Sequence, residues 1–268
     1  MRSVQNIQKI TKAMKMVAAS KMRVAQAATL ESRGLVRPLV RLLGDTPDAD
    51  VEKNLTVAVT TDKGLCGGIN TAVAKYSRAT VKAVATGEGK IAEYVVFGEK
   101  GRSQLVRDSR DSIVATVADV GKVRVTFPQA AAVADILLKT EFDAARLVFN
   151  RFVSAISFKP TIATVLSPAA LERQAEAGGS LDSYEVEGPD RAEMLQDLAE
   201  FTLAATLYNA LLENGCSENA ARMSAMENST KNATEILAQL TLTYNRSRQA
   251  SITTELIEII SGAAALEG

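Results

Sequence analysis

The sequence predicts an α/β protein whose two ends are long helices that pair into one rod, with a mostly parallel α/β domain between them. Two observations predict the rod. Residues 1–33 and 216–261 contain no Gly and no Pro. In both segments a stripe of mainly apolar side chains repeats at alternating steps of three and four residues, which is the spacing of coiled coils. The third observation predicts the domain, because β-branched apolar runs alternate with helical segments between these ends.

The first 33 residues are expected to form the first helix of the rod, with coiled-coil spacing and a net charge of +6. Seven basic residues stand against Glu31 alone, although Lys plus Arg equals Asp plus Glu at 31 each over the whole chain. The partner of this helix is therefore expected to be acidic, with contacts that weaken as salt rises. Two other interpretations are an ordinary amphipathic helix on a core and a mitochondrial transit peptide. The predicted stripe is Ile7, Ile10, Met14, Val17, Lys21, Val24 and Ala28.

The middle of the chain is expected to fold as alternating strands and helices. The expected strands are 55–61, 91–98, 112–118 and 145–150, and 154–167 is expected to add an antiparallel strand in which Pro160 marks an edge or a turn. Helices are expected at 70–85, 99–107 and 128–140, and a loose loop at 172–190.

The last zone is expected to form a second, longer helix. Asp190 suggests a helix start for residues 191–214, and Gly215 either interrupts the helix or is absorbed at a cost of about 1 kcal/mol. Residues 216–261 alone would form a helix of about 70 Å, which needs a partner along its length or a cavity around it. Polar residues interrupt the apolar stripe of this helix. The stripe then changes register, as expected when a straight helix of 3.6 residues per turn drifts against a seven-residue repeat. The stripe is Met223, Met226, Thr230, Ala233, Leu237, Leu240 and Tyr244, followed by Arg248, Ile252, Leu256, Ile259 and Ala263.

The segment TDKGLCGGIN (61–70) follows a strand and opens a helix, where phosphate-binding loops occur. Its glycines at 64, 67 and 68 fit neither G-x-G-x-x-G nor a Walker A loop, so a tight turn that needs glycine backbone freedom is favoured. Asp62 and Lys63 are expected to be surface contacts.

Little in the composition points to catalysis. The sequence has no His, which removes the commonest general base. Cys66 and Cys216 are 150 positions apart, so a disulfide framework or zinc site is not expected, and Cys66 is expected to be a small buried side chain. Glu255 and Glu258 are expected to form a solvated or partner-facing edge.

Five segments closely resemble the gamma subunit of F-type ATP synthases: SVQNIQKITKAMKMVAASKM (3–22), TTDKGLCGGIN (60–70), FNRFVSAISF (149–158), ENAARMSAMENSTKNA (218–233) and TLTYNRSRQASITTELIEIISGAAAL (241–266). The resemblance implies an antiparallel coiled coil of the N- and C-terminal helices with a Rossmann-like α/β domain inserted between them. The implied domains are residues 1–44, 45–190 and 191–268.

The resemblance also implies a function. The chain would be the non-catalytic central-stalk rotor of a proton-translocating ATP synthase, at one copy per complex. It would contact the hexamer of alpha and beta subunits, the small delta/epsilon stalk subunits and the membrane c-ring. Rotation of the ring would turn the helix pair and drive each beta catalytic site through states of different affinity. No cofactor, metal or nucleic acid is implied.

The resemblance assigns roles to three groups of residues. Candidates for contact with the acidic lever segments of beta are Lys12, Met14, Lys15, Arg248 and Gln249. The seam of the helix pair would be formed by Ile7, Ile10, Val17, Leu237, Leu240, Tyr244, Ile252 and Leu256. The turn with Asp62, Lys63, Gly64, Gly67 and Gly68 would lie in the globular foot, near the ring.

Two departures from the family pattern bear on these expectations. The chain starts about a dozen residues later than is usual in the family, so the lower part of the first helix would be missing or differently numbered, and the basic stretch reads as shaft. The cysteine-bearing insertion of chloroplast relatives is absent. A mitochondrial protein on the matrix side of the inner membrane is favoured over a bacterial one. The competing hypotheses are a dinucleotide-dependent enzyme with helical arms and a coiled-coil tether at a membrane surface.

Overall fold

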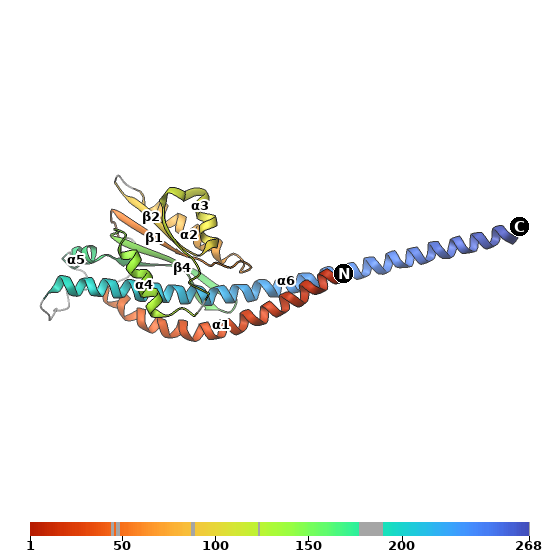
Figure 1. Ribbon diagram of the computed structural model, residues 1–268, viewed down its shortest axis with the longest axis horizontal. Helices are drawn as coiled ribbons and strands as arrows, with labels where there is room; N and C mark the ends of the chain where they lie inside the picture. Colours follow the sequence, from red (N-terminus) through yellow and green to blue (C-terminus); the bar gives the residue numbers. More distant parts are fainter. Residues whose placement is uncertain (44–45, 47–48, 87–88, 123, 177–189, 268) are drawn as a thin grey trace. The chain divides into compact units, whose positions relative to one another are not determined.

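The computed structural model describes residues 1–43, 46, 49–86, 89–122, 124–176 and 190–267 (Figure 1). The chain divides into two compact units. The helical unit comprises Met1–Val17 and Ala225–Gly268, and the sheet unit comprises Ala18–Ser224. The elements, in order, are α1 (Arg2–Leu43), β1 (Lys53–Val59), α2 (Ile69–Val84), β2 (Ile91–Phe97), α3 (Glu99–Ser109), η1 (Arg110–Ser112), β3 (Ile113–Val117), α4 (Phe127–Leu138), β4 (Ala144–Ser154), β5 (Ser157–Leu166), α5 (Pro168–Glu176) and α6 (Arg191–Glu267).

The sheet unit contains a five-stranded sheet in the order β3-β2-β1-β4-β5. The first four strands in this order pair in parallel, and β5 pairs antiparallel with β4 as a hairpin. The predicted mostly parallel sheet with an antiparallel last strand is therefore confirmed. Pro160 lies in the edge strand β5, where a residue without a backbone N–H is tolerated because only one side of the strand pairs with a neighbour.

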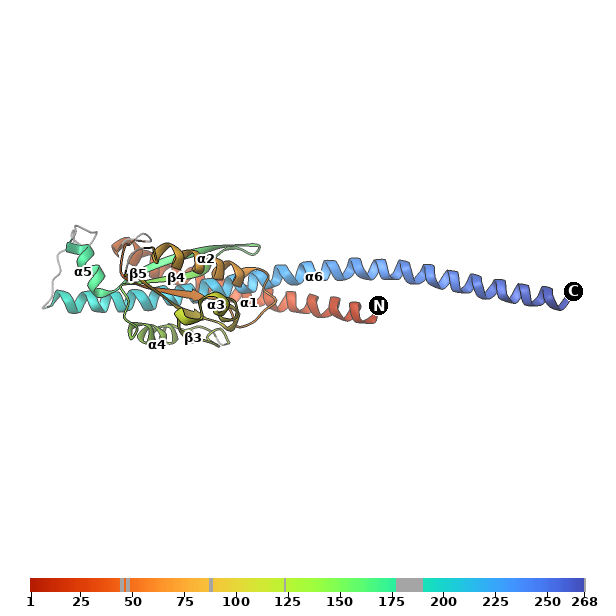
Figure 2. The same cartoon turned by 90° about the horizontal axis from the view of Figure 1, so that it is seen from above.

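Helices cover both faces of the sheet (Figures 1 and 2). On one face α4 and the first part of α6 pack together against the strands, with Leu147 of β4 and Leu207 of α6 in one buried cluster. On the other face α2 and α3 pack through Val73 and Leu105 against Val96 and Val148. Because β1 is buried on both sides, consecutive side chains from Asn54 to Val59 are all buried, and burial does not alternate along the strand.

Gly98 makes the tight connection between β2 and α3. Its φ is +90°, and a Cβ there would lie 2.7–2.8 Å from backbone atoms of Thr61. Only glycine fits, because both the backbone conformation and the close approach exclude a side chain.

The structure differs from the sequence expectation after β5, whereas α6 begins where the sequence predicted and takes one of the two alternatives given for Gly215. Helix α5 occupies Pro168–Glu176, so residues 172–176 of the expected loop are helical, and residues 177–189 lie outside the described residues. Helix α6 begins at Arg191, where the Asp190 carboxylate accepts the Ala192 N–H at 2.9 Å, and it runs through Gly215 without a break. A single glycine costs about 1 kcal/mol in a helix, which packing of the neighbouring residues on the sheet readily offsets.

Candidate functional site: the helix pair and the turn at residues 61–70

Within the sheet unit, α1 and α6 run antiparallel and are joined by polar side chains. The Thr29 hydroxyl donates to the Leu212 carbonyl at 3.2 Å, and the Asn209 amide donates to the Ser32 hydroxyl at 2.9 Å. Residue numbers therefore rise along α1 as they fall along α6. Small and polar side chains at this contact allow close approach of the two helices, and the hydroxyls of Thr29 and Ser32 both have hydrogen-bond partners.

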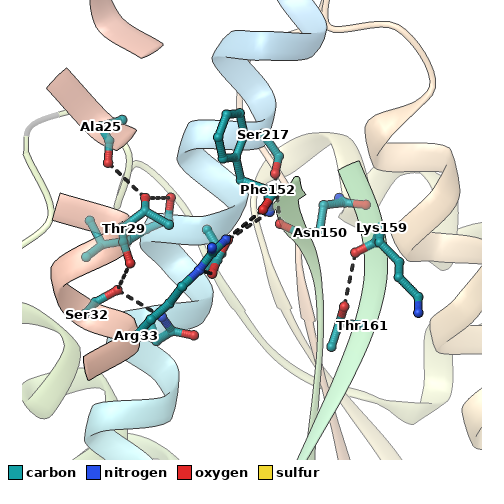
Figure 3. A network of polar contacts seen from close by, with 12 residues as sticks. Ala25, Thr29, Ser32, Arg33, Asn150, Phe152, Lys159, Thr161 and Ser217 are labelled. Carbon is teal, nitrogen blue, oxygen red and sulfur yellow. Dashed lines mark hydrogen bonds and ion pairs between the residues drawn. The ribbon is translucent and has the colours of Figure 1, made fainter. Parts of the chain in front are cut away.

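A buried ion pair joins both helices to the sheet (Figure 3). Arg33 Nε lies 2.5 Å from Glu213 Oε1, and Nη2 lies 2.9 Å from Oε2. The same Oε2 accepts the Phe152 N–H at 2.8 Å, while Arg33 donates to the Phe152 carbonyl at 2.6 Å. The hydrogen bond to Glu213 raises the pKa of Arg33 against the opposing effect of burial. The network thus fixes α1, α6 and β4 at one point by directional bonds.

Next to this pair, a second set of contacts continues the join between α6 and β4. The Ser217 hydroxyl donates to the Asn150 carbonyl at 3.0 Å, and the Asn150 amide donates to Asn214 Oδ1 at 3.0 Å. Glu213, Asn150, Asn214 and Ser217 are buried and Arg33 is partly buried, so bulk water competes little for these hydrogen bonds.

Sequence reasoning did not single out Arg33 and Glu213. A signal for Glu213 was available, since it stands inside an otherwise mostly apolar stretch of the last helix, and a buried carboxylate requires a cation or several donors. Nothing local identified Arg33 as that cation, because the two residues are 180 positions apart.

The helical unit pairs the first turns of α1 with α6 through lighter contacts. Thr230 Oγ1 lies 2.7 Å from Thr11 Oγ1, and the Gln8 amide donates to Thr234 Oγ1 at 2.8 Å. Lys15 pairs with Glu227 at 3.1 Å, with both side chains about 40% exposed. An exposed pair of this kind contributes about 0–1 kcal/mol. The pairing in this unit is therefore weak compared with that around Glu213.

The structure places most of the predicted seam on the exposed side of the helices. The buried stripe of α1 lies one position away, with Thr11 at 8% and Ala18 at 2% exposure, whereas Ile10 is 58% exposed. On α6, the buried side chains include Met226 and Ala233. The prediction followed the largest apolar side chains, but these helices approach through small and polar ones. The exposed members of the predicted seam are Ile7, Ile10, Val17, Leu240, Tyr244, Ile252 and Leu256, and Leu237 is partly buried.

Helix α6 continues past the N-terminus of α1, as both views show (Figures 1 and 2). Every side chain from Leu242 to Ala263 is exposed. The large apolar ones among these described residues are Leu242, Tyr244, Ile252, Leu256, Ile257, Ile259 and Ile260. Such a concentration of exposed apolar surface marks a site of protein contact.

The predicted partner-contact residues fall into two separate groups. Lys12 is exposed, while Met14 and Lys15 are partly buried and Lys15 is paired with Glu227. Arg248 and Gln249 are exposed and lie on the part of α6 that follows these pairs. The structure does not bring the two groups together.

Hydrogen bonds to neighbouring segments of the chain hold the turn at residues 61–70 in place. Asp62 accepts the Glu99 N–H at 3.2 Å with one carboxylate oxygen and the Asp119 N–H at 3.0 Å with the other. Asp62 thus ties loops together, which differs from the surface role expected for it, whereas Lys63 is exposed as expected. Gly67 has a φ of +62°, which explains one glycine, while Gly64 and Gly68 have no left-handed φ.

Cys66 is buried beside this turn, as expected, and burial raises the pKa of its thiol. Burial likewise raises the pKa of Cys216 to about 11. Both thiols are therefore protonated at neutral pH and poorly nucleophilic.

Two further features concern ligands and membranes. Within the residues that the structure describes, no three His, Cys, Asp or Glu side chains converge as a metal site would require. None of the helices in the described part combines the length and apolarity needed to cross a bilayer.

Comparison with known protein families gives a match along nearly the whole chain. A family model described as "ATP synthase" matches residues 1–266. The chain is 56% identical to the mitochondrial ATP synthase subunit gamma of Ipomoea batatas and 55% identical to that of Arabidopsis thaliana, covering all of this chain and 83% of each relative. The ATP synthase gamma chain of Dinoroseobacter shibae is 43% identical over 98% of this chain and 96% of that relative.

Solved structures with a similar fold come from the same kind of complex. One is from the central stalk and c-ring of the Tetrahymena thermophila mitochondrial ATP synthase, with a TM-score of 0.67, 30% identity, and coverage of 82% of this chain and 99% of that one. Another is from the rotor of the Euglena gracilis mitochondrial ATP synthase, with a TM-score of 0.79, 23% identity, and coverage of 94% and 95%. At 23% identity, the similarity to the Euglena chain concerns the fold alone.

Proposed function

The chain belongs to the family of ATP synthase gamma subunits, and from this premise we propose that its paired terminal helices transmit rotation through the described exposed surface of α6. As a gamma subunit it is part of the central stalk of the enzyme. Its partners are the alpha and beta subunits, the other stalk subunits and the c-ring, and it belongs to the peripheral part of the complex on the matrix side of the mitochondrial inner membrane.

The exposed end of α6 is the observation that carries the proposal. Side chains from Leu242 to Ala263 are exposed among the residues that the structure describes, and many are large and apolar. A single helix in water gains most of its stability from packing, so this part needs a surrounding surface to stay helical. The hexamer of alpha and beta subunits supplies such a surface around a central shaft.

The acidic lever segments of beta are proposed to contact Lys12, Met14 and Lys15 on α1, and Arg248 with Gln249 on α6. The exposed cations among them suit an acidic partner. A guanidinium can bind a carboxylate through two parallel hydrogen bonds, and Lys12 can contribute as a point charge. Charged contacts at a solvated surface are individually weak, which suits a shaft that must release one beta subunit before it engages the next.

Catalysis is proposed to lie outside this chain. The sequence has no His, and both of its thiols are buried and protonated. In this proposal the ring turns the shaft, and the shaft biases each beta site toward one affinity state by making different contacts in each orientation. The domain division into 1–44, 45–190 and 191–268 remains a prediction.

Co-purification and coupled synthesis test the proposal. Purification of the complex through a tagged beta subunit should yield this chain at one copy per six alpha and beta subunits. Arg248→Ala with Gln249→Ala should lower proton-driven ATP synthesis in reconstituted vesicles without lowering the helix content of the chain.

The matched control is Lys82→Ala with Arg107→Ala, two exposed side chains on helices of the sheet unit. This control should leave synthesis unchanged. Equal rates for the Arg248/Gln249 variant and the native complex would show that the contact assignment is wrong.

A further inference from the structure

The sheet unit contains a cavity of about 550 Å³ that the helix-pair function does not use. It lies at the carboxyl ends of the parallel strands, where Val59, Phe97 and Val117 form part of its wall. Turns of α1 and α6 and the segment between β3 and α4 close the other sides. In open α/β sheets the crevice outside the carboxyl ends of the strands is the usual place for ligands, and this volume lies within the range of small-molecule sites.

The carboxylates that line the cavity are all engaged within the protein. Asp62 accepts two backbone N–H groups, as described above. Asp119 pairs with Lys122 at 2.7 Å, and Glu218 pairs with Arg222 at 2.5 Å. The charges of Asp119 and Glu218 are therefore paired, and the Asp62 carboxylate keeps its charge while both of its oxygens accept backbone N–H groups.

Three of the cations that line it are not engaged in this way. Lys21, Lys63 and Arg124 line the cavity, are exposed, and form no ion pair with another residue of the described part of the chain. The wall also includes buried apolar side chains, with Phe97 at 2% and Leu211 at 9% exposure. The cavity therefore combines an apolar interior with positive charge that is free to bind an anion.

We propose that this cavity binds a small organic anion with a flat apolar body and one anionic group. The apolar body packs against Phe97 and Leu211, and the anionic group meets Lys21, Lys63 and Arg124. A single group is favoured over a polyphosphate, because Gly67 and Gly68 of the turn do not line the cavity and so provide no backbone cradle for phosphates. The inference stands independently of the rotor function, since every lining residue belongs to the sheet unit.

The test uses the full chain and the fluorescent anion 8-anilinonaphthalene-1-sulfonate, with its neutral analogue N-phenyl-1-naphthylamine. The sulfonate should bind at one saturable site, about tenfold or more tighter than the neutral analogue, with affinity that falls as salt rises. The variant Lys21→Met with Lys63→Met and Arg124→Met should weaken the sulfonate by about tenfold or more and leave the neutral analogue unchanged. Lys75→Met with Lys82→Met and Arg107→Met removes the same charge from exposed positions that do not line the cavity, and it should have no effect.

A second pair of variants tests the location. Ala28 of α1 lines the cavity and Ala27 does not, so Ala28→Phe should abolish saturable binding while Ala27→Phe preserves it. Val24→Trp, at an exposed lining position, serves the same purpose if Ala28→Phe melts at a lower temperature. The exposed end of α6 offers the dye a common background in all variants. Equal binding of sulfonate and neutral analogue, or equal losses in the two triple variants, would overturn the proposal.

Discussion

The carboxylate of Glu213 in α6 holds the guanidinium of Arg33 in α1 through two parallel contacts of 2.5 and 2.9 Å, deep enough that the Glu213 side chain is 2% exposed. Phe152 of β4 completes the arrangement, because its N–H and carbonyl bond to opposite members of the pair. Three elements far apart in sequence are thereby held at one point.

Removal of Glu213 should destabilise the chain strongly. Glu213→Ala leaves Arg33 without its partner and the Phe152 N–H without an acceptor, so the free energy of unfolding should fall by about 4 kcal/mol. Glu213→Gln should cost less, since its amide oxygen can still accept the Phe152 N–H. Urea unfolding followed by circular dichroism measures both. Glu227→Ala, which breaks the exposed pair with Lys15, should cost at most about 1 kcal/mol, and a loss equal to that of Glu213→Ala would contradict this ranking.

The two glycines at 98 and 215 should respond oppositely to alanine. Gly215 lies inside α6, and apart from the adjoining helix backbone no atom of the described residues lies within 4 Å of the place that a Cβ would take, so Gly215→Ala should stabilise the chain by about 0.5–1 kcal/mol. Gly98→Ala should instead destabilise it by about 2 kcal/mol or more, because its φ is +90° and the new methyl would clash with the Thr61 backbone. Thermal melts of the two variants decide the matter, and stabilisation by Gly98→Ala would show that the β2–α3 connection does not approach Thr61 in this way.

The position of the helix seam can be tested by neighbouring substitutions. Ala18→Leu should overpack the contact and cost about 1–3 kcal/mol, because Ala18 is 2% exposed. Val17→Ala should change stability by less than about 0.5 kcal/mol, because Val17 faces solvent in the isolated chain. Denaturant titration of the isolated chain compares them. A larger loss of stability for Val17→Ala than for Ala18→Leu would show that the helices pack through the apolar stripe that the sequence predicted.

Alkaline pH should weaken the fold through Cys216. Burial raises the pKa of this thiol to about 11 from an ordinary value of 9.0, so between these values the unfolded chain loses the proton and the folded chain keeps it. The contribution of Cys216 to stability is fully present below about pH 9 and is lost as pH rises to about 11. The difference in unfolding free energy between the native chain and Cys216→Val, measured across this window, isolates the effect from Lys and Tyr titration. A difference that stays constant with pH would contradict it.

The sequence predicted the order of strands and helices well because that information is local. Continuous apolar runs such as 55–59 mark strands buried on both faces, and the punctuation by Gly and Pro marks their ends. The antiparallel last strand was also predicted, and the structure shows that its connection to β4 is too short for a parallel crossover. Helix α5 was missed because its nine residues carry too short a pattern to stand out from a loop.

The side chains that join the helices could not be predicted in the same way. Thr11, Ala18 and Thr29 are buried by close helix approach, and no periodicity of large apolar residues announces a contact made through small ones. The partner of Glu213 depends on a fold that brings together residues 180 positions apart. The cavity beside Phe97 is likewise formed by segments from five parts of the chain, so only the folded structure reveals it.

The uncovered stretch from Leu242 to Ala263 also bears on the life of the protein before assembly. A newly made copy exposes a run of apolar side chains to chaperones and proteases until a partner covers it. The amount of folded chain should therefore follow the amount of its partners, because copies made in excess keep this apolar surface exposed and are subject to aggregation or degradation.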